Sequence, residues 1–377
     1  MSKPTIVDLF SGCGGFGLGA ELAGFHSQIA VDIDETLQSA YSKNFPNTLT
    51  VQADIGAIEE SAWRHLLGDQ RPAGVIGGPP CQGFSRIGRR RADDPRNTLI
   101  NHFFRTVVTL DPTFFIMENV EGLLDAENVN FLMSALELVA KRYHVVGPLV
   151  VKASDYGAPT TRTRVVIVGY NPEEIGPFST ADFLPKKNTR TVTVHEAISD
   201  LPMPILTSRS PDDFGWASYN DTPYDELSPY AKHARKTPPR GLGWETARKF
   251  LKEQICSGHE ITVHSESVSN RYGALLPGQV DLISKSSRLK WGGLCTTLRA
   301  GTGNDRGCHQ AVRPIHPDQA RVITVREAAR MQGFPDWYTF HHTKWHSFRM
   351  LGNSVSPIVA KALLRPFVDK CKLSIAA

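Results

Sequence analysis

The chain has few cysteines, little excess charge and no long apolar run. Its six cysteines among 377 residues form no Cys-x-x-Cys pair and no cluster with histidine, which argues against a metal site and against a disulfide framework. The 42 basic and 38 acidic side chains leave a net charge of +4, too small to indicate nucleic-acid binding by itself. No stretch approaches membrane-spanning length and no basic leader with an apolar signal stretch opens the sequence, so a cytoplasmic protein is expected.

Short apolar runs alternate with helical patterns over the first ~170 residues, which predicts an α/β fold with a doubly wound, mostly parallel sheet. Strands are expected at 5–10, 28–31, 49–52, 74–76, 113–117, 143–151 and 164–169, and helices at 18–23, 35–44, 99–110 and 130–141. Residues 171–320 are rich in Pro, Gly, Ser and Thr and have long connections, which are usually functional. Helices return at 321–332, with Thr324 and Glu327 as a capping box, and at 357–370 after a Gly352-Asn353 turn.

A glycine-rich turn follows the first expected strand. Gly12, Gly14 and Gly17 satisfy G-x-G-x-x-G, a pattern that suits close approach of a nucleotide but also serves as a simple tight turn. Asp32, at the end of the next strand, is placed to accept from both ribose hydroxyls, and Asp54, after the third strand, from an adenine amino group. NAD and S-adenosylmethionine fit these features equally well, because both contain adenosine.

Cys81 follows the fourth expected strand on a loop of glycine and proline. A lone cysteine is more often a buried small hydrophobe, but a loop of this composition is poor core material and displays its side chains. A thiolate attacks electrophilic ring carbons, whereas hydride transfer has no use for one here, so the loop favours S-adenosylmethionine over NAD.

Three charged residues are expected near this loop. Glu118 ends the fifth strand, where it either caps the next helix or hydrogen-bonds a heterocyclic nitrogen. Arg162 and Arg164 are two residues apart just before the apolar run of the last expected strand and should therefore point the same way, which suits binding of an anion or else a solvated strand edge.

Taken in chain order, these motifs resemble those of the DNA cytosine-5 methyltransferases of prokaryotic restriction-modification systems. The matching segments are the glycine loop, 31–34, 53–55, 79–82, 118–120, 162–164, 321–335 and 352–355. They extend over nearly the whole chain, and the ordered set is far more specific than any one member. The chain departs from the family where Thr160, Met350 and Ser356 replace Gln, Gln and Pro, and where Ile33 replaces an aromatic ring.

The resemblance implies the Rossmann-like fold of S-adenosylmethionine-dependent methyltransferases, with S-adenosylmethionine as the cofactor. It implies a catalytic domain at 1–184, a smaller irregular target-recognition domain with a hinge at 185–345, and a C-terminal segment at 346–377 that returns to the catalytic domain. Phe10 would stack on the adenine. The implied cofactor-binding residues are Phe10, Ser11, Gly12, Gly14, Gly15, Asp32, Ile33, Asp54, Ile55, Pro79, Leu99, Asn353, Ser354 and Val355.

The resemblance also implies a covalent mechanism. Cys81 adds to carbon 6 of cytosine, Glu118 contacts the ring nitrogen and the exocyclic amine, and Arg162 helps to hold the base, with Arg164 beside it. Methyl transfer to carbon 5 and loss of the carbon 5 proton then free Cys81, and no metal is required. A cytosine inside a duplex cannot reach such a pocket, so the target base must be flipped out.

Basic segments indicate where double-stranded DNA is contacted. Residues 83–105 carry six arginines against two aspartates; such a run is usually a solvated face, but directly after the nucleophile it is expected to clasp phosphates as a lid. The glycine-rich segment that begins at Thr296 resembles the recognition loop of the family. Expected DNA contacts are Gln82, Ser85, Arg89, Arg96, Thr297, Arg299 and Arg306, the last two with guanine.

The expected function is therefore that of a restriction-modification methylase that acts on double-stranded DNA as a monomer, with a separate restriction endonuclease as its functional partner. Three alternatives stay open: a tRNA cytosine-5 methyltransferase, a catalytically idle DNA-binding regulator and, last, an NAD-dependent dehydrogenase. The long variable region favours duplex DNA. The presence of Cys81, Glu118 and Arg162 argues against the idle regulator.

Overall fold

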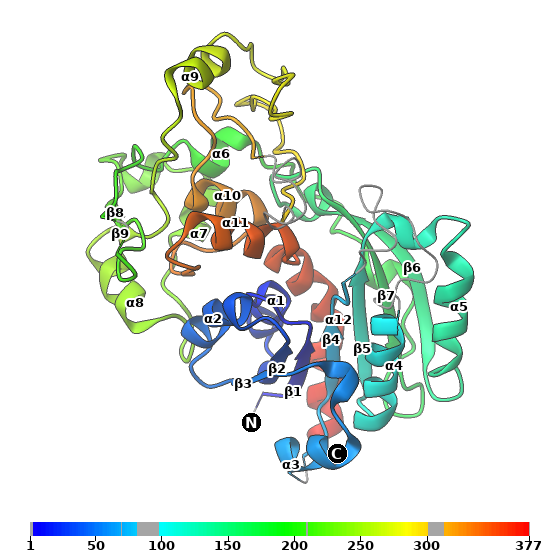
Figure 1. Ribbon diagram of the computed structural model, residues 1–377. Helices are drawn as coiled ribbons and strands as arrows, with labels where there is room; N and C mark the ends of the chain where they lie inside the picture. Colours follow the sequence, from blue (N-terminus) through cyan, green and yellow to red (C-terminus); the bar gives the residue numbers. More distant parts are fainter. Residues whose placement is uncertain (1–2, 69, 81–97, 209, 301–312, 377) are drawn as a thin grey trace.

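A seven-stranded sheet forms the centre of the computed structural model, which describes residues 3–68, 70–80, 98–208, 210–300 and 313–376 (Figure 1). The strand order is β3-β2-β1-β4-β5-β7-β6. The first five strands are parallel, whereas β7 runs antiparallel to both β5 and β6. The strands are β1 (Thr5–Leu9), β2 (His26–Asp32), β3 (Leu49–Gln52), β4 (Gly74–Gly77), β5 (Phe114–Asn119), β6 (His144–Lys152) and β7 (Thr163–Tyr170).

Helices cover both faces of this sheet, because successive apolar residues on each strand point to opposite sides. On β5, Phe114 belongs to the core that α1 (Gly15–Ala23) and α12 (Pro357–Ala376) share, whereas Phe115 belongs to the core on the other face. That second core is completed by α3 (Glu60–Leu67), α4 (Thr98–Leu110) and α5 (Val129–Glu137). The doubly wound α/β fold expected from the sequence is confirmed.

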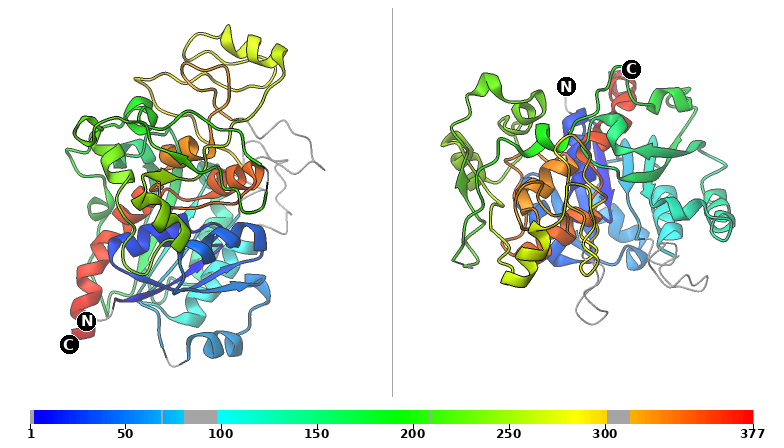
Figure 2. Two further views of the ribbon diagram at one scale, coloured as in Figure 1. Left: turned by 90° about the vertical axis from the view of Figure 1, so that its left-hand side faces the viewer. Right: turned by 90° about the horizontal axis from the view of Figure 1, so that it is seen from above.

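The remainder of the chain forms a smaller, irregular part that stands beyond the upper end of the sheet in Figure 1. Its lobe around α9 lies farthest from α3 and from the two ends of the chain, as both figures show (Figure 2). The elements of this part are α6 (Val194–Ile198), α7 (Pro229–Ala234), α8 (Glu245–Lys252), α9 (Glu266–Gly273), α10 (Val325–Gln332), α11 (Lys344–Asn353), and the strand pair β8 (Ala217–Ser218) and β9 (Ile255–Cys256). Short 3-10 turns are η1 (Ile55–Ala57), η3 (Glu121–Leu124), η4 (Ala153–Tyr156), η5 (Thr180–Phe183) and η6 (Tyr224–Glu226).

A buried arginine holds the smaller part together. Arg330 on α10 is fully buried and forms ion pairs with Asp336 at 2.6 Å and with Asp200 at 2.9 Å. Asp200 comes before Arg330 in the chain and Asp336 comes after it, so Arg330 ties α10 to the segment that follows α6. Burial of a charged arginine is tolerated here because each nitrogen of its guanidinium group donates a hydrogen bond.

Two details of the sequence prediction at the C-terminal end have different outcomes. The capping box is confirmed, since Thr324 precedes α10, its hydroxyl accepts from Glu327 N, and its backbone N donates to the carboxylate of Glu327. The expected turn at Gly352 and Asn353 is wrong, because both residues belong to the last turn of α11, and the chain leaves the helix at Ser354. Among the described residues, no helix combines the length and apolarity that crossing a bilayer requires.

Candidate active site

A tight turn joins β1 to α1. Phe10, Gly12 and Gly14 have left-handed backbone angles, with φ of 54°, 51° and 89°. A Cβ on Gly14 would lie 2.8 Å from the rings of Tyr41 and Phe45, so this position requires glycine. A Cβ on Gly12 would meet no atom within 4 Å. The turn is therefore packed at Gly14 and open to a ligand at Gly12.

Asp32, the last residue of β2, fastens this turn. Its Oδ2 accepts from Gly12 N and its Oδ1 from Asp34 N, both at 2.8 Å, and burial raises the pKa of its carboxyl group. The hydroxyl of Ser11 is buried and lacks a hydrogen-bond partner within the described chain. An open backbone turn, a fixed carboxylate and an unpaired hydroxyl suit a ligand with ribose hydroxyls, so these residues fit the adenosine part of S-adenosylmethionine.

The carboxyl group of Asp8 lies beneath the turn. Its Oδ2 accepts from the Tyr41 hydroxyl at 3.2 Å, while its Oδ1 is buried without a partner in the described chain. Burial raises the pKa of Asp8 to about 8, so the carboxyl is largely protonated at neutral pH. A neutral Asp8 avoids placing a second buried negative charge next to Asp32.

The other predicted cofactor residues come from separate segments. Ile33 is 67% exposed directly after β2, and Asp54 caps η1 by accepting from Gly56 N at 2.8 Å. A Cβ on Gly15 would lie 1.9 Å from Ser354 Oγ, so the chain after α11 packs directly on the start of α1. Of the remaining residues, Ile55 and Pro79 are buried, Leu99 and Val355 are half-buried, and Asn353 is exposed.

Glu118 lies beside the loop that leads to Cys81. Its Oε2 is 3.2 Å from the position of a Cβ on Gly78, and the side chain of the next residue, Asn119, donates to Pro79 O at 3.2 Å. The parallel pairing of β4 and β5 accounts for this proximity, because the carboxyl ends of neighbouring parallel strands meet at one edge. The described part of the loop is therefore held against the strand that ends in Glu118.

The two predicted arginines have different surroundings. Arg164 places its Nε 3.0 Å from Glu118 Oε1. Arg162 is only 3% exposed, and its Nη1 donates to Gly352 O at 2.9 Å and lies 3.5 Å from Leu298 O. Burial, with the nearby charge of Arg164, lowers the pKa of Arg162 to about 9. Arg164 is thus the arginine that pairs with Glu118, while Arg162 joins the strand to two distant segments.

These three charged side chains lie at one pocket. Its other walls are largely apolar and come from α1, β6, η4, β7, α12 and the segment just before α12 (Phe16, Val151, Ala153, Val166, Val355, Ser356, Val359 and Leu363). Arg162 Nε and Ser356 Oγ are buried without a hydrogen-bond partner in the described chain. The pocket therefore combines a low-dielectric wall with polar groups that are free to bind a polar guest.

The residue just before the predicted recognition segment pairs with the chain that leads into β7. Cys295 N donates to Pro159 O at 2.9 Å, and Thr161 N donates to Cys295 O at 2.8 Å. Thr160, which replaces the usual Gln, is buried here and its hydroxyl has no partner within the described chain. Further along, Thr297 is half-buried and Arg299 is exposed. Sequence reasoning did not identify Cys295 or Leu298, because both act through backbone groups.

Six predicted residues lie outside the described part of the chain, and the structure does not place them: Cys81, Gln82, Ser85, Arg89, Arg96 and Arg306. Across the ranges that the structure does describe, His, Cys, Asp and Glu side chains form no group of three or more that suits a metal ion.

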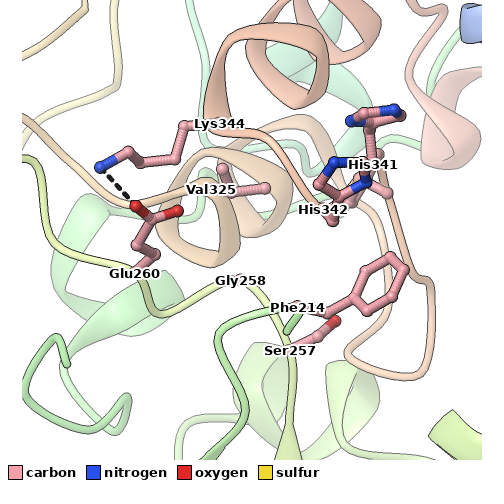
Figure 3. Close-up of a pocket in the computed structure, with 9 residues that line it drawn as sticks. Phe214, Ser257, Gly258, Glu260, Val325, His341, His342 and Lys344 are labelled. Atoms are coloured by element: carbon pink, nitrogen blue, oxygen red, sulfur yellow. Dashed lines mark ion pairs between the residues drawn. The ribbon is translucent and has the colours of Figure 1, made fainter. Parts of the chain in front are cut away.

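A second pocket lies elsewhere in the smaller part (Figure 3). Glu260 and Lys344 form an ion pair of 2.9 Å at its edge, and Phe214 and His342 also line it. It shares no lining residue with the pocket of Glu118. Lys344 also donates to Ile261 O at 2.6 Å, so its ammonium group is already engaged and braces α11 against the segment after β9.

The mostly parallel sheet, its two helical layers and the fastened glycine turn define the Rossmann-like fold of the S-adenosylmethionine-dependent methyltransferase class. The sequence matches the C-5 cytosine-specific DNA methylase family over residues 4–368, and the chain belongs to that family. It is therefore a methyltransferase that acts on carbon 5 of cytosine in DNA. Methyltransferases of this kind generally use S-adenosylmethionine.

Individual relatives agree with this assignment. The chain is 40% identical to type II methyltransferase M.XorII of Xanthomonas oryzae pv. oryzae, over 96% of this chain and 84% of that protein. It is 30% identical to type II methyltransferase M.DdeI of Desulfomicrobium norvegicum, over 95% and 87%. A crystal structure assigned to a prophage-encoded DNA modification methyltransferase of E. coli superposes with a TM-score of 0.87 at 41% identity, covering 98% of this chain and 99% of the other. The Dnmt2 methyltransferase of S. pombe, at 17% identity and a TM-score of 0.61 over 97% and 99%, shares the fold.

Proposed function

We propose that this enzyme methylates a flipped-out cytosine within a specific double-stranded DNA sequence, through a covalent adduct with Cys81, as the modification component of a type II restriction-modification system. We further propose that it acts as a monomer in the cytoplasm, apart from its cognate endonuclease. The observation that carries the proposal is the pairing of Glu118 with Arg164 beside the loop of Pro79. In the proposal, this acid and this cation contact a base that enters beside the loop.

S-adenosylmethionine, when bound, supplies a methyl group that its sulfonium makes electrophilic. The glycine turn and Asp32 would hold its adenosine part, and the segment at Asn353 and Ser354 its methionine part. The fit is supported by the open turn at Gly12 and by the unpaired hydroxyl of Ser11. The ribose hydroxyls would then take the remaining lone pairs of the Asp32 carboxylate.

Cys81 supplies the electrons that carbon 5 of cytosine lacks. Its thiolate forms a bond to carbon 6, and the electron pair of the carbon 5–carbon 6 double bond becomes available at carbon 5. Glu118 stabilises the added proton at the ring nitrogen, and Arg164 orients the carboxyl group of Glu118 through their ion pair. After methylation, a base such as water takes the carbon 5 proton, the electrons of that C–H bond re-form the carbon 5–carbon 6 double bond, and the carbon 6–sulfur bond breaks, which releases the Cys81 thiolate.

The arginine assignment differs from the expectation drawn from the sequence. Arg162 was expected to hold the base, yet its Nη1 already donates to the carbonyl of Gly352. We propose that Arg164 contacts the base together with Glu118, and that Arg162 positions the pocket relative to the recognition segment. The apolar walls around these charges strengthen each hydrogen bond to the base, because they exclude water.

The test is methylation in a host without cytosine methylation. Wild type, Cys81→Ala, Glu118→Gln and the control Glu121→Gln, an exposed acid two residues beyond Asn119, are expressed, and 5-methylcytosine is mapped at base resolution. We expect one short motif to be modified by wild type and the control only, with activity of Glu118→Gln lower by about 100-fold or more. Covalent capture on duplexes with 5-fluorocytosine tests the adduct.

Two outcomes would contradict the proposal. Unmodified DNA, with methyl transfer to tRNA by the purified enzyme, would move the substrate to RNA. Full activity of Cys81→Ala would exclude the covalent mechanism, whatever the substrate.

A further inference from the structure

Exposed apolar side chains are concentrated in the lobe around α9. Of the 16 large hydrophobic residues that are exposed in the described chain, five lie within residues 263–283. Leu282 and Ile283, at 81% and 71% exposed, are neighbours at the tip of a hairpin that follows α9. Such a concentration in a soluble protein indicates a contact surface.

Buried polar contacts support the hairpin, which comprises residues 278–288. Its two arms are paired through an antiparallel bridge between Val280 and Ser287, and Arg288 N donates to Gln279 O at 2.8 Å. Asp281 is only 1% exposed; its carboxylate accepts from Ser284 N and from Arg271 Nε, each at 2.6 Å. These contacts fix the backbone on both sides of the tip.

The guanidinium of Arg288 anchors the base of the hairpin. Its nitrogens donate to Pro317 O at 2.7 Å and to Tyr272 O at 2.9 Å, so the hairpin is joined both to the end of α9 and to the strand-like segment before α10. The apolar tip is therefore displayed by a two-stranded ribbon that hydrogen bonds hold in place, although leucine and isoleucine side chains are usually buried. Lys285, at the tip and exposed, adds a positive charge.

The hairpin is continuous with the recognition segment. Ser287 Oγ lies 3.4 Å from Thr296 Oγ1. Thr296 directly follows Cys295, whose backbone pairs with Pro159 and Thr161. The contact between Ser287 and Thr296 and the backbone pairing of Cys295 thus connect the hairpin to the residues next to Arg162. In Figure 1, the lobe stands at the end of the molecule toward which the glycine turn and the carboxyl ends of the parallel strands point.

We propose that this hairpin enters the major groove of the DNA substrate, and that Leu282 and Ile283 read the 5-methyl groups of thymines in or beside the modified sequence. A two-stranded ribbon fits the width of the major groove, and an aliphatic side chain recognises thymine by contact with its methyl group. Lys285 then faces the phosphates. This inference rests on the proposed function, because it takes the same double-stranded DNA as the substrate.

The test compares duplexes that contain thymine with the same duplexes in which uracil replaces thymine and so removes the methyl groups. Binding, by fluorescence anisotropy, and kcat/KM for methylation are measured for wild type and for Leu282→Ser with Ile283→Ser. The control is Met133→Ser, within α5, with Leu138→Ser, just beyond its end, where both side chains are more than half exposed. Thermal unfolding verifies that all three proteins fold.

For wild type and the control, we expect about fourfold weaker binding for each thymine methyl that is lost, since burial of one methyl group has about this effect. The hairpin variant should bind thymine duplexes more weakly and should not distinguish uracil from thymine.

Wild-type binding that does not change with uracil, or a hairpin variant with the same preference as wild type, would refute the inference. A wild-type dimer in light scattering that the hairpin variant converts to a monomer would also refute it, and would make a second copy the occupant of this surface. Binding without methylation would contradict the proposed function and would still test the hairpin.

Discussion

Gly352→Ala is a substitution for which the structure predicts a loss of catalysis together with a loss of stability. Gly352 belongs to the last turn of α11, and a Cβ at this position would lie 2.2 Å from Ala300 N and 2.4 Å from Arg299 C. Side-chain carbons do not approach backbone atoms this closely, so the recognition segment must move by about 1 Å. Such overpacking costs about 1 to 3 kcal/mol of stability. The carbonyl of Gly352 also accepts from Arg162, so the shift reaches the pocket.

We expect the methylation rate of Gly352→Ala to fall about 100-fold, because a displacement of this size disturbs the alignment of reacting groups. The assay is single-turnover transfer of a labelled methyl group to a duplex with the mapped motif, beside calorimetric binding of S-adenosylhomocysteine and urea unfolding. Gly292→Ala is the matched control, since a Cβ there meets no atom within 4 Å. A wild-type rate for Gly352→Ala would refute the reasoning. If binding of S-adenosylhomocysteine falls by the same factor as the methylation rate, the loss of activity comes from the neighbouring Asn353 instead.

Three further outcomes follow from buried polar groups. Asp336→Asn should lower the free energy of unfolding in urea by about 3 kcal/mol, because it removes a buried partner of Arg330, whereas the exposed Asp212→Asn should leave it unchanged. Asp8, with its raised pKa, contributes stability that is present below about pH 4 and is lost as the pH rises toward 8; Asp8→Asn should therefore gain about 3 kcal/mol relative to wild type between pH 5 and pH 8, and a constant difference would contradict the assignment. Thr324→Ala should cost about 1 kcal/mol in the same unfolding assay, and an unchanged midpoint would deny the capping box a role.

The sheet could be predicted because each of its strands carries a local signal. Alternation of short apolar runs with helical patterns is a property of neighbouring residues, and burial on both faces makes the first four residues of β5 apolar. The capping box at Thr324 is equally local. Such features depend on residues three or four apart, so a single sequence contains them.

The contacts that build the pocket are not local in this sense. The pairing of Arg164 rather than Arg162 with Glu118 depends on where two antiparallel strands place their side chains, and the spacing of the arginines does not determine it. The partners of Arg162 are backbone carbonyls, and any residue type can supply those. The sequence predicts a turn at Gly352, whereas the structure requires glycine there because the backbone of residue 300 approaches it closely. Glycine has both uses, and the sequence does not distinguish them.

Contacts between segments that are distant along the chain connect residues 298–300 to the pocket of Glu118. Residues 298–300 lie between Arg162, which precedes the recognition part in the chain, and Gly352, which follows it. A single guanidinium therefore contacts both the recognition segment and the helix that leads into α12. We expect that a shift of residues 298–300 on DNA binding would change the hydrogen bonds of Arg162, which lies two residues before Arg164. We therefore predict that the position of residues 298–300 also affects the ion pair between Arg164 and Glu118.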